Sequence, residues 1–437
     1  MISLYLKTDT RLVAFFNNCN FFMICIQELL KMFRFKNVAV AVSGGVDSAV
    51  AAFLLKKKGF NVQAVFMENW DVNDEKGYCS LDADYADAID LCKFLNIKLH
   101  KVSFVKQYWN EVFCNLIKDY ESGLTPNPDV LCNRHIKFNY LYNYIINTLG
   151  ADAIATGHYA CSSFGPFLEN YEPNKVVKLL KAKDPKKEQL LFLSQVEQEA
   201  LRKTMFPLGP FLKSEVKSIA YQYGLEKFAK KKESMGICFI GTRDFQNFIR
   251  EYIEDKPGHF IDIDTGKVVG EHRGLHQWTF GQRSKISGLP KAYFIARKNI
   301  EKNEILLAGG TEHNILYSKL FFTSTPHWIA GKPEELQNED ILECEFQFQN
   351  TQDWVPCVIF ECNKGLIVQL KTTKRAVTPG QYAAFCKGNE CLGSARIVYT
   401  PVSEFSVNYM NNFSNEEKNI ENEDKIEDVD YISRVCN

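Results

Sequence analysis

Val38-Ala-Val-Ala-Val-Ser-Gly-Gly-Val-Asp-Ser48 is the stretch that decides the fold. Val38 to Val42 form an apolar, mostly β-branched run, which is typical of a strand buried on both faces of a parallel sheet. Ser43, Gly44 and Gly45 interrupt this run, and residues 49–58 have helical composition. A strand, a glycine turn and a helix place backbone N–H groups at a helix N-terminus, where the helix dipole favours an anion. Adjacent glycines let the backbone close around a phosphate, so the stretch predicts a phosphate-binding loop.

The spacing of this loop differs from that of a Walker A motif, because no lysine follows the glycines. Ser43-Gly-Gly-Val-Asp-Ser48 instead resembles the PP-loop of ATP pyrophosphatases, which cleave ATP between its α and β phosphates and adenylate a substrate. The alternative is an ordinary glycine-rich turn after a strand. A complete hexapeptide directly after a buried strand favours the PP-loop.

Strands and helices alternate after this loop. We expect strands over residues 61–67 and 98–104, helices over 81–95 and 108–120, and a further strand within 151–160. Such alternation predicts a doubly wound parallel α/β sheet, whose ligands lie at the carboxyl ends of the strands. The Ser43 loop, Met67 and His158 all fall at such ends, although a single histidine is as often structural as ligand-binding.

A candidate reactive thiol follows in residues 123–138, Gly-Leu-Thr-Pro-Asn-Pro-Asp-Val-Leu-Cys-Asn-Arg-His-Ile-Lys-Phe. The two prolines predict a rigid loop. Asp129 and Cys132 are three residues apart, so they would face the same side of a helical turn that starts there. The polar and basic residues 133–137 predict electropositive surroundings, which would lower the pKa of the thiol. The alternative is a buried structural cysteine.

A second thiol, Cys238, lies on an expected short apolar strand after the basic residues 230–232. Taken alone it is typical of a core cysteine. As a partner of Cys132 it matters more, because two thiols can pass a sulfur atom through persulfide and disulfide exchange. Residues 178–189 form a basic segment that suits a phosphate-backbone contact, with a solvated loop as the alternative.

Composition limits the class of protein. The chain has 437 residues, 46% of them apolar and 24% charged, which is ordinary for a soluble protein of two or three domains. With a net charge of −1, a nucleic acid would have to be held by local basic patches. The 14 cysteines contain no Cys-x-x-Cys pair, so they indicate neither a zinc ribbon nor a disulfide framework, and we expect a reducing compartment.

The texture of the sequence changes along the chain. Residues 259–269, 274–280 and 293–296 are expected strands of a small β-rich domain, and alternation over 311–397 predicts a small barrel or sandwich. Residues 12–30 are apolar but interrupted by Asn, so they make a poor transmembrane span. Residues 1–35 are expected to be a targeting segment, or else an upstream extension with translation able to begin at Met32. Four further segments are expected: the α/β domain over 36–243, the β-rich domain over 244–310, the barrel over 311–402 and a disordered acidic tail over 403–437.

Several motifs in order carry a family resemblance. Beside the loop they are Phe66-Met-Glu-Asn-Trp-Asp71, Thr125-Pro-Asn-Pro-Asp-Val-Leu-Cys-Asn133, Ala155-Thr-Gly-His-Tyr159, Glu233-Ser-Met-Gly-Ile-Cys-Phe-Ile-Gly241, Gly281-Gln-Arg283, Thr378-Pro-Gly-Gln381 and Cys391-Leu-Gly393. From about Asn37 to Ile397 the chain resembles the tRNA-specific 2-thiouridylases, PP-loop enzymes of the adenine nucleotide alpha hydrolase-like fold. Ser194-Gln-Val196 and Val355-Pro-Cys-Val358 look closer to the mitochondrial branch than to the bacterial one.

The resemblance implies an activity: adenylation of C2 of the wobble uridine, position 34, in the tRNAs for Lys, Glu and Gln, followed by replacement of oxygen with sulfur. It implies that Cys132 is the nucleophile, Cys238 the persulfide carrier and Asp129 an acid or base. The residues implied to hold ATP, with Mg²⁺, are Ala41, Val42, Ser43, Gly44, Gly45, Val46, Asp47, Ser48, Met67 and Gly157. Those implied to meet tRNA are Asn127, Pro128 and Asp129 at the target base, and His158, Lys187, Glu188, Gln189, Gln347, Phe348 and Gln381 elsewhere.

Two departures from the bacterial pattern stand out. Gln347-Phe348 replaces Arg-Tyr, which puts a charge–phosphate contact there in doubt, and Glu188 replaces Asp. A base in the anticodon loop can be splayed out into a pocket, which suits this chemistry. We further expect a protein sulfur donor, a monomer, no membrane association, and a mitochondrial location with the cytoplasm as alternative.

Three alternatives stay open from the sequence. The first is a PP-loop AMP-forming ligase that acts on a small molecule, which leaves Cys132, Cys238 and the β domains without a role. The second is a non-catalytic tRNA-binding protein with a relict loop. The third keeps the thiolation reaction but adds an iron–sulfur cluster held by the two cysteines and one other ligand.

Overall fold

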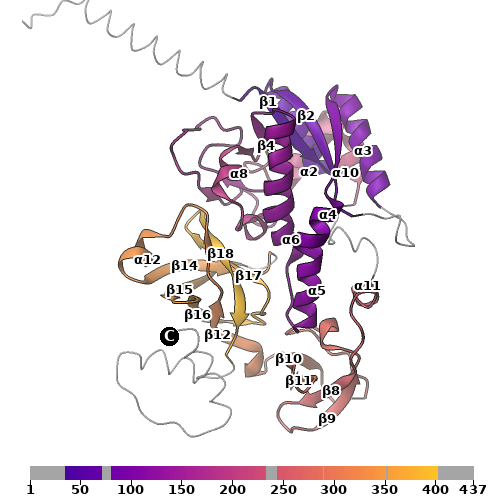
Figure 1. Ribbon diagram of the computed structural model, residues 1–437, viewed down its shortest axis with the longest axis vertical. Coiled ribbons are helices and arrows are strands. Elements are labelled where there is room, and N and C mark those ends of the chain that lie inside the picture. The colour runs from indigo at the N-terminus through magenta and orange to yellow at the C-terminus, as the bar shows by residue number, and fades with distance from the viewer. Residues whose placement is uncertain (1–34, 71–79, 233–243, 289, 351–352, 402–437) are drawn as a thin grey trace, which may run out of the picture.

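The computed structural model describes residues 35–70, 80–232, 244–288, 290–350 and 353–401. In Figure 1 an α/β domain lies at the top, and a barrel and a smaller sheet lie side by side below it. The predictions for the N-terminal segment, for Cys238 and for the acidic tail concern residues outside these ranges. Within the described ranges, no helix combines the length and apolar character needed to cross a bilayer.

The α/β domain is built on a five-stranded sheet in the order β3-β2-β1-β4-β7. Its strands are β1 (Asn37–Val42), β2 (Asn61–Glu68), β3 (Lys98–Ser103), β4 (Ala153–Ala155) and β7 (Thr204–Met205). Every pairing in this sheet is parallel. The order reverses between β1 and β4, which confirms the predicted doubly wound fold and marks the point where such sheets bind ligands.

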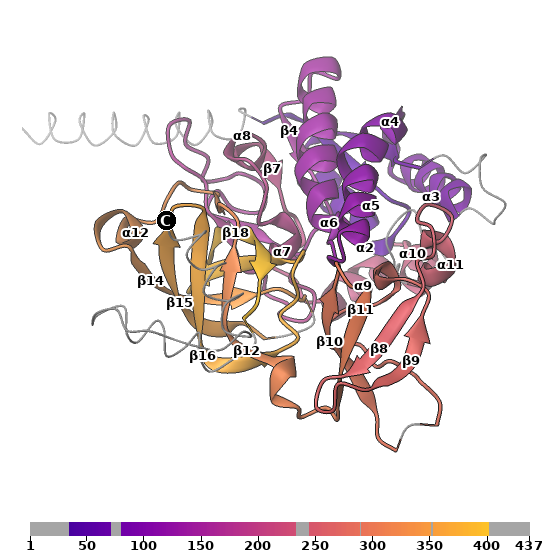
Figure 2. The same cartoon turned by 60° about the horizontal axis from the view of Figure 1, so that its bottom comes forward.

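Helices pack on this sheet and connect its strands (Figures 1 and 2). They are α2 (Val46–Lys57), α3 (Ser80–Leu95), α4 (Val105–Tyr108), α5 (Cys114–Glu121), α6 (Pro128–Leu131), α7 (Leu190–Leu193), α8 (Gln198–Arg202), α9 (Lys213–Gln222) and α10 (Glu226–Lys230). Wider π-type helical turns follow two of these helices: η1 (Trp109–Phe113) continues α4, and η2 (Cys132–Leu141) continues α6. A third, η3 (Tyr144–Thr148), comes next in the chain after η2. The helices predicted over 81–95 and 108–120 are therefore present, the second with a π-turn inside it.

The central domain is a four-stranded sheet in the order β10-β11-β8-β9, preceded by α11 (Phe245–Ile249). The strands are β8 (Gly258–Asp262), β9 (Val268–His272), β10 (Tyr293–Asn299) and β11 (Glu304–Gly309). Two predictions here were wrong. Residues 259–269 form a hairpin rather than one strand, because Gly266 adopts a φ of 66° and turns the chain. Residues 274–280 contain the 3₁₀ turn η4 (Leu275–Gln277), whose side chains tertiary packing buries.

The C-terminal part is a closed antiparallel barrel. Its strands are β12 (Tyr317–Thr323), β14 (Ile341–Gln347), β15 (Val355–Cys362), β16 (Gly365–Arg375), β17 (Tyr382–Lys387) and β18 (Glu390–Tyr399). They follow the order β12-β16-β15-β14-β17-β18, and β12 pairs with β18 to close it. Accessory elements are η5 (Asn314–Leu316), β13 (His327–Trp328) and α12 (Glu334–Asn338). The predicted barrel is thus confirmed.

The α/β domain and the barrel share one sheet. The short strands β5 (Cys161–Ser162) and β6 (Leu179–Leu180) leave the α/β domain, and β6 pairs with β18 of the barrel. A buried polar link lies nearby, where the amide of Gln195 donates to the carbonyl oxygen and hydroxyl of Ser394 at 2.9 and 2.8 Å. The domain boundaries drawn from the sequence stay a prediction, because this shared sheet leaves no sharp border.

Candidate active site

The phosphate loop connects β1 to α2 without a side-chain cap. Gly45 is the N-cap of α2, and no side chain caps the first turn of this helix. Ser48 shapes the loop from within: its hydroxyl accepts from the Ser43 N–H at 3.1 Å and donates to the Gly45 carbonyl at 3.1 Å. Gly44 has a φ of 72°, and a Cβ there would lie 2.6 Å from the Asp84 carbonyl oxygen. Only glycine fits that position, and the helix N-terminus offers its N–H groups to an anion.

The strand register gathers the other expected nucleotide residues at the same edge. Val42 is opposite Phe66, which places Met67 beside the loop, and Val40 is opposite Ala155. Gly157 then meets the first turn of α2, where a Cβ would lie 2.8 Å from the Ser48 nitrogen. The predicted meeting of strand ends is therefore confirmed, while the nucleotide contacts themselves stay a prediction.

Sequence reasoning missed a lysine that stands at this loop. Lys213, the first residue of α9, places its amine 2.7 Å from both carboxylate oxygens of Asp47, and Tyr159 donates to the same carboxylate at 2.9 Å. The Lys213 side chain is only 11% exposed. A loop without a lysine of its own thus receives a cation from a helix more than 160 residues away. No local pattern around residue 213 announces that role.

A second lysine braces the loop from the other side. Lys231 lies 2.6 Å from the Asp84 carboxylate, 2.5 Å from that of Asp87 and 3.3 Å from the Gly44 carbonyl oxygen. Desolvation opposes both charged forms, but the two carboxylates raise the pKa of Lys231. Lys227 and Lys231 together lower the pKa of Asp87. The chain beyond this lysine leads to Cys238, which lies outside the described residues.

The helix that carries Asp129 and Cys132 starts as predicted. Pro128 occupies its first position and Asn127 its N-cap. Burial raises the pKa of the Asp129 carboxyl, and the charge of Lys137 opposes that rise. Cys132 is buried, with 3% of its surface exposed. A carboxyl whose proton is held more tightly than usual suits a general acid or base.

The predicted electropositive surroundings of Cys132 are partly neutralised. Arg134 donates to the Gln195 side chain at 2.5 Å and lies 3.5 Å from a Glu197 oxygen. Burial lowers the pKa of His135, which favours its neutral form. The charge of Lys137 remains, and it affects Asp129 and His158. We find that the basic run contributes less positive charge than its sequence suggests.

His158 lies between the phosphate loop and the Cys132 helix. Its Nδ1 is 2.9 Å from the Thr156 hydroxyl, and its ring centroid is 5.8 Å from that of Phe138 on η2. Burial holds the pKa of His158 well below its usual value, and Lys137 lowers it further. A neutral imidazole can exchange hydrogen bonds with a ligand but supplies no charge.

The expected tRNA residues fall into three environments. The Glu188 carboxylate is buried, accepts from the Trp354 indole at 3.2 Å and has a pKa raised by burial. Gln189 accepts from the Tyr159 backbone at 2.9 Å. Gln347 and Phe348 are buried in the barrel, where Phe348 stacks on Phe346. Contacts of these residues and of Lys187 with tRNA stay a prediction, and Phe348 presents its ring to the core rather than to the surface.

Gln381 lies against residues 125–127, which lead into the helix of Asp129 and Cys132. Its amide donates to the carbonyl oxygens of Thr125 at 2.8 Å and of Pro126 at 3.1 Å. The Asn127 amide donates in return to the Gln381 side-chain oxygen at 3.3 Å. The structure thus joins two predicted tRNA residues that are 254 positions apart in the chain.

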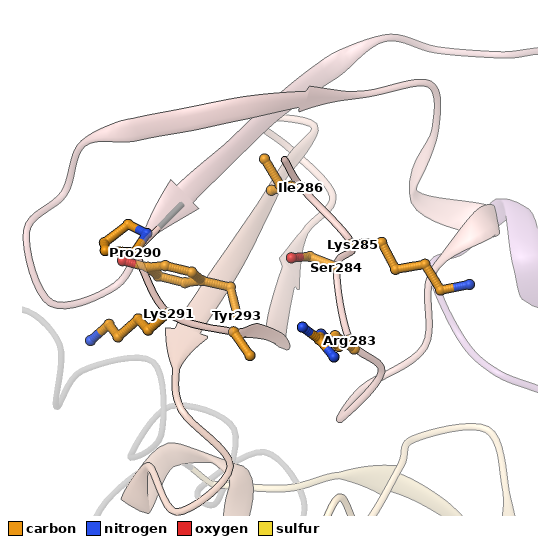
Figure 3. Close-up of a pocket in the computed structure, with 8 residues that line it drawn as sticks. Arg283, Ser284, Lys285, Ile286, Pro290, Lys291 and Tyr293 are labelled. Atoms are coloured by element: carbon orange, nitrogen blue, oxygen red, sulfur yellow. The ribbon is translucent and has the colours of Figure 1, made fainter. Parts of the chain in front are cut away.

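Two pockets lie outside the phosphate loop. One of about 470 Å³ opens on the central domain, where Figure 3 shows Lys285 and Lys291 extending in different directions around Arg283. The other, of about 340 Å³, lies where all three domains meet and is lined by Lys298 among others. Across the described ranges, no group of three or more His, Cys, Asp and Glu side chains is arranged to hold a metal ion.

Comparisons with known proteins divide the chain into three matches. Residues 36–242 match the tRNA methyl transferase HUP domain, 246–309 the tRNA methyl transferase PRC-barrel domain, and 318–397 the aminomethyltransferase beta-barrel domain. A U34-tRNA thiolase NcsA structure from Methanococcus maripaludis aligns with 49% of this chain and 64% of its own length, at 18% identity and a TM-score of 0.30.

Curated relatives cover nearly the whole chain. Mitochondrial tRNA-specific 2-thiouridylase 1 of Gallus gallus is 46% identical over 91% of this chain and 98% of its own length. The protein of that name from Homo sapiens is 45% identical over 85% of this chain and 92% of its own. The tRNA-specific 2-thiouridylase MnmA of Legionella pneumophila (strain Lens) is 43% identical over 82% and 98%.

Proposed function

Because this chain belongs to the family of tRNA-specific 2-thiouridylases, we propose that it replaces the C2 oxygen of wobble uridine 34 in tRNA with sulfur, in a reaction driven by ATP. The tRNAs for Lys, Glu and Gln are the proposed substrates. One observation carries most weight for the site. The turn at Gly157 and His158 contacts the phosphate loop on one side and the helix of Cys132 on the other.

The loop suits a nucleoside triphosphate. The uncapped first turn of α2 offers backbone N–H groups, and the paired Lys213 adds a cation at Asp47. We propose that residues 41–48, Met67 and Gly157 hold ATP, whose role is to activate the C2 oxygen as an adenylate with release of pyrophosphate. Since the Asp47 carboxylate already has two partners, Mg²⁺ would be held largely by the phosphates.

Sulfur transfer is proposed to use the two cysteines in sequence. The terminal sulfur of a Cys238 persulfide attacks the activated C2 and displaces AMP, which leaves Cys238 linked to the base through a disulfide. The Cys132 thiolate then attacks the Cys238 sulfur, so the 2-thiouridine leaves with the transferred atom and a Cys132–Cys238 disulfide remains. A thiol reductant reopens this disulfide. Asp129 is the proposed proton carrier at the base.

The partners follow from this chemistry. We propose that tRNA presents its anticodon loop to Asn127, Pro128 and Asp129, that a separate protein supplies persulfide sulfur, and that the enzyme acts as a monomer. We propose a mitochondrial location because the chicken and human relatives carry it in their names. Recovery of the protein only from the cytosolic fraction of cells would contradict that location.

The reaction is tested by mass spectrometry of tRNA nucleosides after incubation with ATP, Mg²⁺ and a persulfide source. The wild-type chain should form 2-thiouridine, while Cys132→Ser and Cys238→Ser should form none. Cys114→Ser is the matched control, since this half-buried cysteine of α5 lies outside the proposed site and should retain activity. Pyrophosphate release with a small acceptor and no thiolated tRNA would instead favour an AMP-forming ligase.

A further inference from the structure

The loop that enters the Cys132 helix is held by a turn of the barrel. This turn, residues 378–381, sits against residues 125–127, and Gln381 makes three hydrogen bonds across the gap. The Thr125 N–H donates to the Pro379 carbonyl oxygen at 3.1 Å as a fourth. Four hydrogen bonds over three residues fix a short segment in position.

The backbone of the turn is shaped for this approach. Gly380 has a φ of 98°, and a Cβ there would lie 2.8 Å from the backbone nitrogen and oxygen of Thr125. Backbone atoms cannot move aside as a flexible side chain can, so any larger residue would push the loop away. The barrel and the loop are therefore in close backbone contact at Gly380 and Thr125.

The position of Asn127 reveals what the contact controls. Asn127 is the N-cap of the helix that carries Asp129 and Cys132, yet its side chain does not cap that helix. An N-cap asparagine usually accepts from the N–H groups of the first turn. Here its amide instead donates to Gln381. The barrel, and not the helix itself, thus sets the orientation of the Asn127 side chain.

Contacts on the preceding residues hold the same segment. The Lys298 amine of the central domain donates to the Gly123 carbonyl oxygen at 2.8 Å. Arg396 of the barrel lies 2.6 Å from an Asp119 carboxylate oxygen, as an ion pair. The segment from Asp119 to Asn127 is consequently held by contacts with both the central domain and the barrel.

We infer that Gln381 is a positioning residue that sets the loop at residues 125–127, and through Asn127 the first turn of the Asp129–Cys132 helix. This inference rests on the proposed function for its effect on turnover. It differs from a direct tRNA contact of Gln381, because the side chain acts on the protein before RNA binds. The barrel thereby supplies part of the geometry of the reaction centre in the α/β domain.

Substitutions at Gln381 test the inference. Gln381→Ala removes all three side-chain bonds, and Gln381→Glu keeps an acceptor for Asn127 but loses both donors to the loop. A displaced reaction centre lowers kcat, and we expect a fall of about tenfold to a hundredfold in both variants. The KM for tRNA should stay within about twofold of wild type. Gln369→Ala, on strand β16 of the same barrel, is the matched control and should leave both parameters unchanged.

Hydrogen exchange supplies a readout that needs no activity. In the absence of ATP and tRNA, amides of residues 123–132 should exchange about tenfold faster in both Gln381 variants than in wild type and Gln369→Ala. A raised KM for tRNA with unchanged kcat and wild-type exchange would overturn the inference and favour a direct RNA contact. A wild-type chain that forms no 2-thiouridine would refute the proposed function, and the exchange rates would then decide the inference alone.

Discussion

At the scale of single residues, the site depends on side chains that reach it from distant parts of the sequence. Lys213 is the clearest case, because it supplies positive charge to a phosphate loop that contains none. Its amine is paired with Asp47 on both carboxylate oxygens and is nearly buried. Removing the amine would leave the negative charge of the Asp47 carboxylate, within the proposed phosphate-binding loop, without this cation.

We therefore predict that Lys213→Met weakens binding of ATP by about tenfold or more, because an unbalanced carboxylate repels phosphate at close range. Lys213→Arg should retain most of the affinity, since it keeps the charge. Isothermal titration of the protein with ATP measures both. Lys175→Met, which removes a surface partner of Glu172, is the control. Equal affinity in Lys213→Met and wild type would contradict the assignment.

Sequence reasoning found local features of the site and missed distant ones. The Ser43 loop and the start of the Asp129–Cys132 helix were predictable, because each is written in a few consecutive residues. The hydrogen bond of Arg134 to Gln195 and its ion pair with Glu197 were not, since those partners lie some 60 residues further along. The contact of Gln381 with Asn127 was invisible for the same reason.

At the scale of elements, the strand pattern of the parallel sheet was readable, while the central domain was less so. A buried β-branched run such as β1 can be recognised as a strand from its sequence. The conformation of Leu275 to Gln277 cannot, because their burial comes from packing rather than from an alternating pattern. The pairing of β6 with β18 could not be predicted from the sequence either, since a strand of two residues shows no periodicity.

The join between these elements gives a stability prediction. Ser394 on β18 accepts from Ser194 and Gln195 through its hydroxyl, at 2.7 and 2.8 Å, and all three residues are buried. Ser394→Ala should lower the free energy of unfolding by about 1–3 kcal/mol, because buried polar groups lose a partner. Chemical denaturation measures the loss. Ser218→Ala, on the exposed face of α9, should change it by less than about 0.5 kcal/mol.

At the scale of the whole molecule, Lys298 stands where the three domains meet. It is half-buried and lines the 340 Å³ pocket, and desolvation of its amine lowers the pKa of that amine to about 7. Its charge also lowers the pKa of His272 and of His276, for which burial is the larger cause. Because the folded chain binds this proton less tightly than the unfolded one, the unfolded state holds more protons above pH 7.

Stability should consequently rise with pH through this group. The cost of the buried charge is fully present below pH 7 and is relieved as the pH rises above it. We predict that the melting temperature of wild type, relative to that of Lys298→Met, increases between pH 6.5 and 9. Lys302→Met, which alters an exposed lysine of the same domain, should show no such trend. A difference that stays constant across this range would contradict the lowered pKa.

The pairing of β6 with β18 also constrains how the protein is made. Lys178, next to β6, binds Glu390 of β18, and 212 positions separate the two residues. On the ribosome the β6 edge emerges long before its partner has been translated. The α/β domain therefore spends much of synthesis with an unpaired strand edge, which is the type of surface that chaperones cover and that premature termination would leave exposed.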